Sequence, residues 1–262
     1  MNKIFLSVVL LAFAVILHAQ PAPKNSTSEP AKDGKTINAR SLPKVKSRDR
    51  LIIELTHDNW LNKPSYIETK WFSRGFNAFM MWDVPLTKNG TISVAPGFGI
   101  SNTNVFTNVL IQRSALDDST HFNVIPDYVL NQTTPNDLTD SVRLEYSKSK
   151  LAVSSLDIPL ELRFRTNPHK GKPFKLALGA RIGYVVNAHT KYKGDDYRDG
   201  SGRGVTLKES ALNINRFKYG VTARIGYGNF NIFGFYSLSK LFNTSLAPEI
   251  TPISVGISFN SF

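Results

Sequence analysis

The chain has 262 residues, of which 41% are hydrophobic and 20% charged, with a formal net charge of +12 and no cysteine. This length is sufficient for one domain with a sizeable core. The absence of cysteine excludes disulfides, cysteine-ligated zinc, iron–sulfur clusters and thiol nucleophiles. A helical membrane bundle is excluded as well, because the one long apolar run, residues 4–17, is too short to span a bilayer as a helix.

The N-terminal residues are typical of a secretory signal peptide. Lys3 precedes the apolar run, and the small residue Ala19 comes directly before Gln20. We therefore expect residues 1–19 to be a signal peptide that is cut after Ala19. Residues 20–50 contain four prolines, few large apolar side chains and an excess of basic residues. Such a composition cannot bury enough surface to fold alone, so this segment is interpreted as a disordered basic periplasmic leader before one domain, residues 51–262.

From residue 51 onward, apolar residues recur with a period of two, which is typical of β-strands. Between residues 217 and 227, for example, Phe, Tyr, Val, Ala and Ile alternate with Lys, Gly, Thr and Arg. The pattern predicts eight strands, at residues 51–59, 72–84, 92–101, 156–165, 174–188, 217–227, 230–239 and 253–260. Alternation of this kind occurs both in soluble antiparallel sandwiches and in transmembrane barrels.

Three features favour the barrel. Several predicted strands have ten or more residues, enough to cross a bilayer, whereas soluble strands average about 5–6 residues. The polar face carries full charges, which a sandwich core would not tolerate but a barrel lumen does. Short connections alternate with longer ones, and an even strand number places both chain ends on one side. The prediction is an all-β, eight-stranded antiparallel up-and-down transmembrane β-barrel in the outer membrane, with periplasmic N- and C-termini.

Six segments resemble the small outer-membrane β-barrel proteins of Bacteroidota that are grouped as PorT-like. They are residues 71–86 (WFSRGFNAFMMWDVPL), 92–101 (ISVAPGFGIS), 155–164 (SLDIPLELRF), 177–196 (ALGARIGYVVNAHTKYKGDD), 217–230 (FKYGVTARIGYGNF) and 252–259 (PISVGISF). The resemblance covers nearly all of residues 51–262 and implies an eight-stranded outer-membrane barrel. The best-known relatives serve type IX protein secretion, so it implies an accessory or scaffold role in the cell envelope without fixing an activity. Phe259 and Phe262 are the expected C-terminal assembly signal.

Charged residues at inward positions are the main candidate functional residues. The expected lumen charge network consists of Glu54, Asp157, Glu161, Arg163, Arg181 and Arg224. Asp157 and Arg181 are placed almost symmetrically about the turn at residues 166–173, so we expect them to face one another across neighbouring strands. An eight-stranded barrel is only wide enough for side chains to fill it. The network is therefore interpreted as a plug, and the alternative is a narrow pore for small solutes.

A stand-alone barrel that acts on outer-membrane lipid, like a lipid A deacylase, is a further alternative. His57, His189 and Ser239 are all expected near the outer ends of strands, and Asp58 is available to orient a histidine. The spacing is unspecific, however, and no G-x-S-x-G or comparable motif accompanies these residues. Nor is there a convincing metal or phosphate motif. The sequence therefore predicts a non-enzymatic protein with no cofactor and no metal site.

The distribution of basic residues bears on partners. They gather in the leader and in the predicted periplasmic turns, at Lys88, Lys170 and Lys172, whereas the long loop at residues 102–153 is slightly acidic. Positive charge in these places favours anionic lipid or an acidic envelope protein. We expect as partners outer-membrane lipid and lipopolysaccharide, the barrel-assembly machinery during insertion, and other envelope or secretion proteins. Nucleic acid is not expected.

Overall fold

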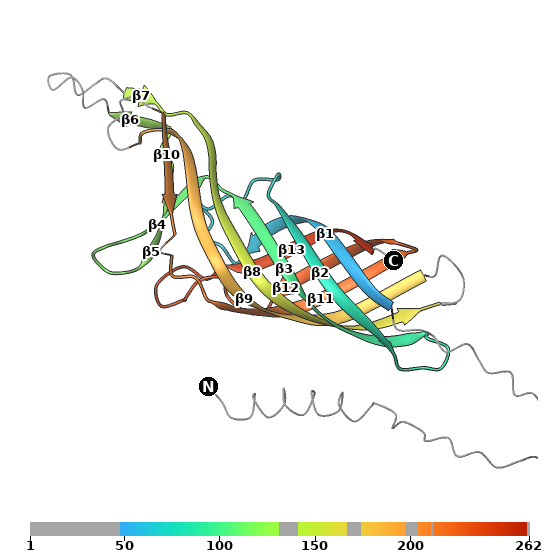
Figure 1. The fold of residues 1–262 in the computed structure, drawn as a ribbon. Coiled ribbons are helices and arrows are strands. Elements are labelled where there is room, and N and C mark those ends of the chain that lie inside the picture. Colours follow the sequence, from blue (N-terminus) through green and yellow to red (C-terminus); the bar gives the residue numbers. More distant parts are fainter. Residues whose placement is uncertain (1–47, 131–140, 167–173, 198–203, 211, 261–262) are drawn as a thin grey trace, which may run out of the picture. The chain divides into compact units, whose positions relative to one another are not determined.

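A computed structural model describes residues 48–130, 141–166, 174–197, 204–210 and 212–260 (Figure 1). The expected signal peptide, residues 1–19, and all but the last three residues of the leader lie outside this part of the chain. Phe262 of the expected assembly signal lies outside it too. In the described part, no helix is long and apolar enough to cross a membrane.

Eight antiparallel strands close into a barrel, as the sequence predicts. Each barrel strand pairs with the barrel strands before and after it in the chain, and the first pairs with the last, so the barrel part of the sheet is closed. The strands are β1 (Arg48–Leu61), β2 (Arg74–Pro85), β3 (Ile92–Phe106), β8 (Tyr146–Arg165), β9 (Phe174–Asp195), β11 (Phe217–Tyr227), β12 (Phe230–Ser237) and β13 (Thr251–Asn260).

The outward face of the barrel is apolar and exposed, and this distinguishes a membrane barrel from a soluble sandwich. On β8, Leu156, Ile158, Leu160 and Leu162 are each between 51% and 65% exposed. The residues between them, beginning with Asp157, are buried. A soluble protein rarely leaves so large an apolar surface uncovered, whereas an apolar exterior around a polar interior is what a transmembrane barrel requires.

Aromatic side chains gather near the ends of the strands, where a membrane barrel carries its interfacial girdles. The rings of Trp82 and Phe98 lie 5.5 Å apart, and those of Tyr184 and Phe217 lie 5.2 Å apart. Phe259 faces outward near the end of β13, with its ring 5.3 Å from that of Phe230 on β12. The part of the expected assembly signal that the structure describes is thus on the apolar exterior.

The two ends of the barrel differ. At one end, here named the turn end, lie the short connections after β2, β8 and β11, together with the beginning of β1 and the end of β13. At the other, the loop end, lie the longer connections after β1, β3, β9 and β12. The connection between β3 and β8 contains two short hairpins, β4 (Val109–Arg113) with β5 (Thr120–Val124), and β6 (Tyr128–Leu130) with β7 (Ser141–Arg143).

Strands β8 and β9 run on past the other strands at the loop end (Figure 1). The extended part of the two strands begins at a register shift between Ser154 and Ser155. At this point β9 carries one extra residue, since Ser154 pairs with Asn187 and Ser155 with Val185. Beyond it, residues 146–154 stay paired with residues 187–194, with a second register shift between Tyr146 and Lys148, and β10 (Gly204–Glu209) joins the free edge of β9. These three segments are named the protrusion. The predicted boundaries of β8 and β9 missed it.

Candidate functional site

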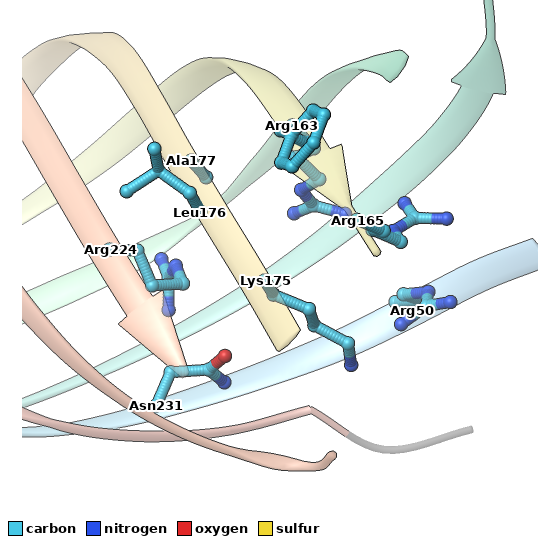
Figure 2. A pocket seen from close by; sticks show the side chains of 9 residues that line it. Arg50, Arg163, Arg165, Lys175, Leu176, Ala177, Arg224 and Asn231 are labelled. Carbon is cyan, nitrogen blue, oxygen red and sulfur yellow. The ribbon is translucent and has the colours of Figure 1, made fainter. Parts of the chain in front are cut away.

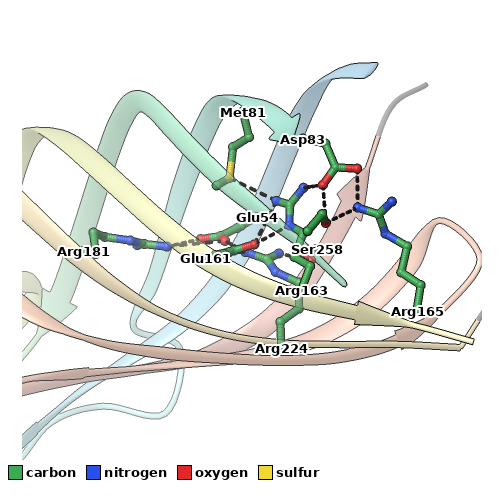
Figure 3. Close-up of polar contacts among 10 residues, drawn as sticks. Glu54, Met81, Asp83, Glu161, Arg163, Arg165, Arg181, Arg224 and Ser258 are labelled. Atoms are coloured by element: carbon green, nitrogen blue, oxygen red, sulfur yellow. Dashed lines mark hydrogen bonds and ion pairs between the residues drawn. The ribbon is translucent and has the colours of Figure 1, made fainter. Parts of the chain in front are cut away.

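The middle of the barrel lumen holds a network of buried ion pairs between residues of four strands (Figure 3). Glu54 of β1 accepts hydrogen bonds from Arg224 at 2.7 Å and from Arg181 at 3.1 Å. Glu161 of β8 accepts one from Arg224 at 2.9 Å and is paired with Arg163 at 2.8 Å. Every second residue of each strand points into the lumen, so side chains from strands far apart in the sequence meet here.

A second group of charges lies nearer the turn end. Asp83 of β2 is paired with Arg165 and accepts a hydrogen bond from the Ser93 hydroxyl at 2.7 Å. Arg163 connects this group to the middle of the lumen, since its Nη1 atom lies 3.7 Å from Asp83. Asp83 and Arg165 were missing from the predicted network, although both occupy inward positions in the alternating pattern.

A third group lies nearer the loop end, and here one expectation was wrong. Asp157 does not face Arg181: in the register of β8 and β9, Arg181 is opposite Pro159, and Asp157 is opposite Gly183. Asp157 is instead paired at 2.9 Å with Lys218 of β11, one strand further around the barrel. Glycine at position 183 leaves space for this contact, because a Cβ atom there would collide with the Asp157 carboxylate.

All six residues expected in the lumen are buried, with exposed fractions between 0% and 6%. Five of them, all except Asp157, form one connected set of ion pairs. The guanidinium of Arg181 also lies between two aromatic rings, 4.4 Å from the centroid of Phe79 and 5.2 Å from that of Phe235. Buried charges are tolerated only when paired in this way, and removing one partner leaves the other uncompensated.

Above the charges, the loop end is filled by an apolar cluster, named the mouth cluster. It joins inward residues of the barrel strands to residues of the loops, and the rings of Phe122 on β5 and Phe242 after β12 meet edge to face at 5.2 Å. Its buried members are Trp60, Ile67, Val105, Val109, Ile111, Phe122, Leu151, Val153, Val185, Phe242 and Ile250. Cluster members on loops cannot be found from alternation, and for this reason the cluster was not predicted.

Little space remains inside the described barrel. A cavity of about 60 Å³ lies between the charge network and the mouth cluster, with Arg181, Lys218 and Val185 in its wall. A cavity of about 20 Å³ at the turn end is lined by the basic side chains of Arg50, Arg163, Arg165, Lys175 and Arg224 (Figure 2). These volumes hold one to a few water molecules. At these two places the described side chains leave room for water alone, which agrees with the plug interpretation.

A larger cavity, of about 300 Å³, lies at the loop end between the β4–β5 hairpin and the protrusion. Tyr192 and Tyr197 are in its wall, with ring centroids 5.7 Å apart, and the Tyr197 hydroxyl accepts a hydrogen bond from Gln112 at 2.8 Å. The pKa of Tyr192 is raised to about 12, first by burial and then by the nearby carboxylates of Asp195 and Asp196. Its phenol therefore stays neutral and serves as a packing and hydrogen-bonding group.

The residues considered for catalysis are not brought together. His57 faces outward on β1, while its neighbour Asp58 faces the lumen and accepts a hydrogen bond from Ser254 at 2.6 Å. The hydroxyl of Ser239 is bonded to the Ser237 hydroxyl and to the backbone N–H of Tyr219, each at 3.1 Å. Within the described ranges, no histidine forms a hydrogen bond with Ser239.

Comparison with known proteins gives one family match. A family model described as "Outer membrane protein beta-barrel domain" matches residues 54–246. Among solved structures, the chain is similar to Ail, the attachment invasion locus protein of Yersinia pestis, at 12% identity. That match covers 81% of this chain and 97% of Ail, with a TM-score of 0.32. Ail in complex with the heparin analogue sucrose octasulfate matches at 12% identity over 82% and 99%, with a TM-score of 0.30. No curated protein matches the chain.

Proposed function

The chain belongs to the family of outer membrane protein β-barrel domains, and we propose that within this family it is a non-conducting, non-enzymatic barrel that acts as a scaffold in the cell envelope. The observation that carries the proposal is the packing of the lumen. Ion-paired side chains fill its middle and the mouth cluster fills its loop end. A protein built in this way offers its surfaces, and not a channel, for function.

We place the turn end in the periplasm and the loop end outside the cell. Short turns on the periplasmic side and longer loops outside are the usual arrangement of outer-membrane barrels. Because the chain has no cysteine, the orientation is testable with single cysteines: Leu116→Cys in the loop between β4 and β5, which is 99% exposed, and Lys88→Cys at the turn end. A membrane-impermeant maleimide should label the first in intact cells and the second only after the outer membrane is permeabilised. The reverse result would overturn the orientation.

The partners we propose are other envelope proteins that contact the loop end. The resemblance to PorT-like barrels of Bacteroidota makes components of type IX secretion the first candidates, and the barrel-assembly machinery the transient partner during insertion. A photo-crosslinking residue at position 116 should capture protein in native membranes. The same residue at Ile158, which is 65% exposed on the lipid-facing side of β8, is the matched control and should capture lipid. Equal protein capture at both positions would contradict a specific partner at the loop end.

Conductance tests the sealed lumen directly. Purified protein that shows the heat-modifiable migration of a folded barrel should give no steady current in a planar lipid bilayer, because ion-paired side chains and the mouth cluster occupy the described lumen. A steady open-channel current would refute the scaffold proposal and favour the narrow pore.

Lipid A from cells that produce the protein should keep its mass, since Ser239 has no histidine partner among the residues described. A loss of acyl chains that depends on Ser239 would instead make it an enzyme.

A further inference from the structure

The outward face of the protrusion carries a set of lysines in register on three neighbouring strands. Lys191 of β9 is directly opposite Lys150 of β8 on one side and Lys208 of β10 on the other. One step further from the membrane barrel, Lys193 of β9 is opposite Lys148 of β8. Directly opposite residues in a sheet point to the same face. These five residues, Lys148, Lys150, Lys191, Lys193 and Lys208, are named the lysine ladder.

The opposite face of the same strands is buried, which fixes the direction in which the ladder points. Ser149 and Leu151 of β8 and Tyr192 of β9 alternate with the ladder residues and are between 1% and 6% exposed. Leu151 belongs to the mouth cluster, and Tyr192 packs with Leu110 and Ile125. The ladder therefore points away from the protein, on the same side of the sheet as the lipid-facing residues of β8.

The part of the chain that the structure describes does not neutralise this charge. Within the described ranges, no carboxylate forms an ion pair with a ladder lysine, and the polar contact of Lys150 is a hydrogen bond of 2.6 Å to the neutral side chain of Asn104. The pKa of Lys150 is lowered, first by burial and then by repulsion from Lys148, Lys191 and Arg74. The pKa of His189, one step toward the membrane, is lowered by burial and by Lys208, Lys150 and Lys191. Like charges opposite one another destabilise a sheet, so folding alone does not account for the arrangement.

The height of the ladder above the apolar band bears on the kind of ligand that it can meet. Lys150 lies six residues along β8 from Leu156, the first exposed apolar residue of the lipid-facing side. At about 3.3 Å per residue along a strand tilted about 40°, this is on the order of 15 Å above the apolar band. Aromatic side chains share this level: Lys150 lies 5.7 Å from the ring centroid of Phe106, which contacts the ring of Phe72 at 4.8 Å. Lysines and aromatic residues next to an apolar band are typical of the headgroup region of a membrane.

We propose that the lysine ladder is a binding site for the phosphate groups of a glycolipid in the outer leaflet of the outer membrane. The inference rests on the proposed function in one respect, since it requires the loop end to face outward. It names the lipid class that the envelope scaffold engages. Continuity with the lipid-facing side favours a membrane lipid over a free polysaccharide, because a lipid held by its acyl chains against β8 brings its headgroup to the ladder.

The test uses the full-length barrel in neutral detergent and two triple variants. Lys150, Lys191 and Lys208 are replaced by Gln in one variant and by Arg in the other, which keeps the charge. Binding of diphosphoryl lipid A is measured by native mass spectrometry, beside dephosphorylated lipid A, inorganic phosphate and heparin as a sulfated polysaccharide. A lysine near an anionic surface contributes about fivefold in affinity, so the Gln variant should bind about a hundredfold more weakly. The Arg variant should bind at least as well as the wild type.

The remaining outcomes separate the possible failures. Removal of like-charge repulsion should make the Gln variant at least as resistant to urea as the wild type, so weaker binding is not a folding defect. Equal binding of lipid A by the Gln variant and the wild type would overturn the proposal, as would equal binding of dephosphorylated lipid A. Competition by millimolar inorganic phosphate, or tighter binding of heparin than of lipid A, would reassign the ladder to a soluble anion. If maleimide labelling finds the loop end in the periplasm, the orientation has failed, whatever the lipid measurement gives.

Discussion

Replacing Glu54 by glutamine tests whether the ion pairs in the lumen hold the barrel together. Glu54 is fully buried and contacts Arg224 at 2.7 Å, Arg181 at 3.1 Å and the Asn77 amide at 2.8 Å. Glutamine keeps the shape and removes the charge. Arg224 would keep Glu161, but Arg181 would lose the one carboxylate with which it forms an ion pair in the described structure. Leaving a buried charge unpaired costs about 3–5 kcal/mol, and we expect Glu54→Gln to lower the free energy of unfolding by this amount.

The matched control is Glu249→Gln. Glu249 forms an ion pair of similar length, 3.0 Å to Lys240, but its side chain is 61% exposed, and such surface pairs contribute about 0–1 kcal/mol. Both variants are compared by urea unfolding in detergent micelles, followed by the fluorescence of the three tryptophans. In the double variant Glu54→Gln/Arg181→Gln, the second substitution should restore about 1 kcal/mol or more, because the unpaired charge is gone. If Glu54→Gln costs no more than Glu249→Gln, the buried network does not stabilise the barrel.

Two further predictions concern packing and pH. A Cβ atom on Gly99 would collide with the carbonyl oxygen of Ala78 and the ring of Phe79, whereas Gly204 faces open space. Gly99→Ala should therefore lower the free energy of unfolding by about 1–3 kcal/mol, and Gly204→Ala by less than about 0.5 kcal/mol. Equal urea midpoints for the two variants would refute the close approach of β2 and β3. Since Tyr192 has a pKa of about 12 in the folded protein and about 10 in an unfolded chain, its contribution to stability should be complete below pH 10 and lost between pH 10 and 12. In absorbance titrations at 295 nm, the difference between the folded and the unfolded protein at pH 10–12 should be smaller by one tyrosine in Tyr192→Phe than in the wild type.

The barrel itself was predictable because a membrane-spanning strand meets lipid on one side and the lumen on the other. This forces a strict alternation, and all eight predicted segments correspond to barrel strands in the right order. The alternation weakens where a strand leaves the membrane. For this reason the predicted ends at Ser101 and Ala188 fall short of the observed ends at Phe106 and Asp195. The hairpins β4–β5 and β6–β7 and the edge strand β10 are short and were not predicted.

The sequence predicted which residues lie in the lumen but not which of them form ion pairs with one another. Inward position follows from alternation, so Glu54, Glu161 and Arg224 were identified as lumen residues. Their partners depend on strand register and side-chain reach, which a single sequence does not give. Asp157 illustrates this: its long partner Lys218 reaches it over Gly183, from a strand that is not its neighbour.

The extra residue in β9 exchanges the inward and outward faces of this strand between the barrel and the protrusion. Below the register shift, the even-numbered residues Ile182 and Tyr184 face outward toward lipid and Val185 faces inward. Above it, the faces of β9 are exchanged, so that Tyr192 faces inward and Lys191 and Lys193 face outward. Without the shift, continued alternation would turn Lys191 and Lys193 toward the mouth cluster and Tyr192 toward the headgroups. The inserted residue therefore gives Lys191 and Lys193 their outward direction and Tyr192 its inward one, whereas β8 keeps its alternation and places Lys148 and Lys150 outward without a shift.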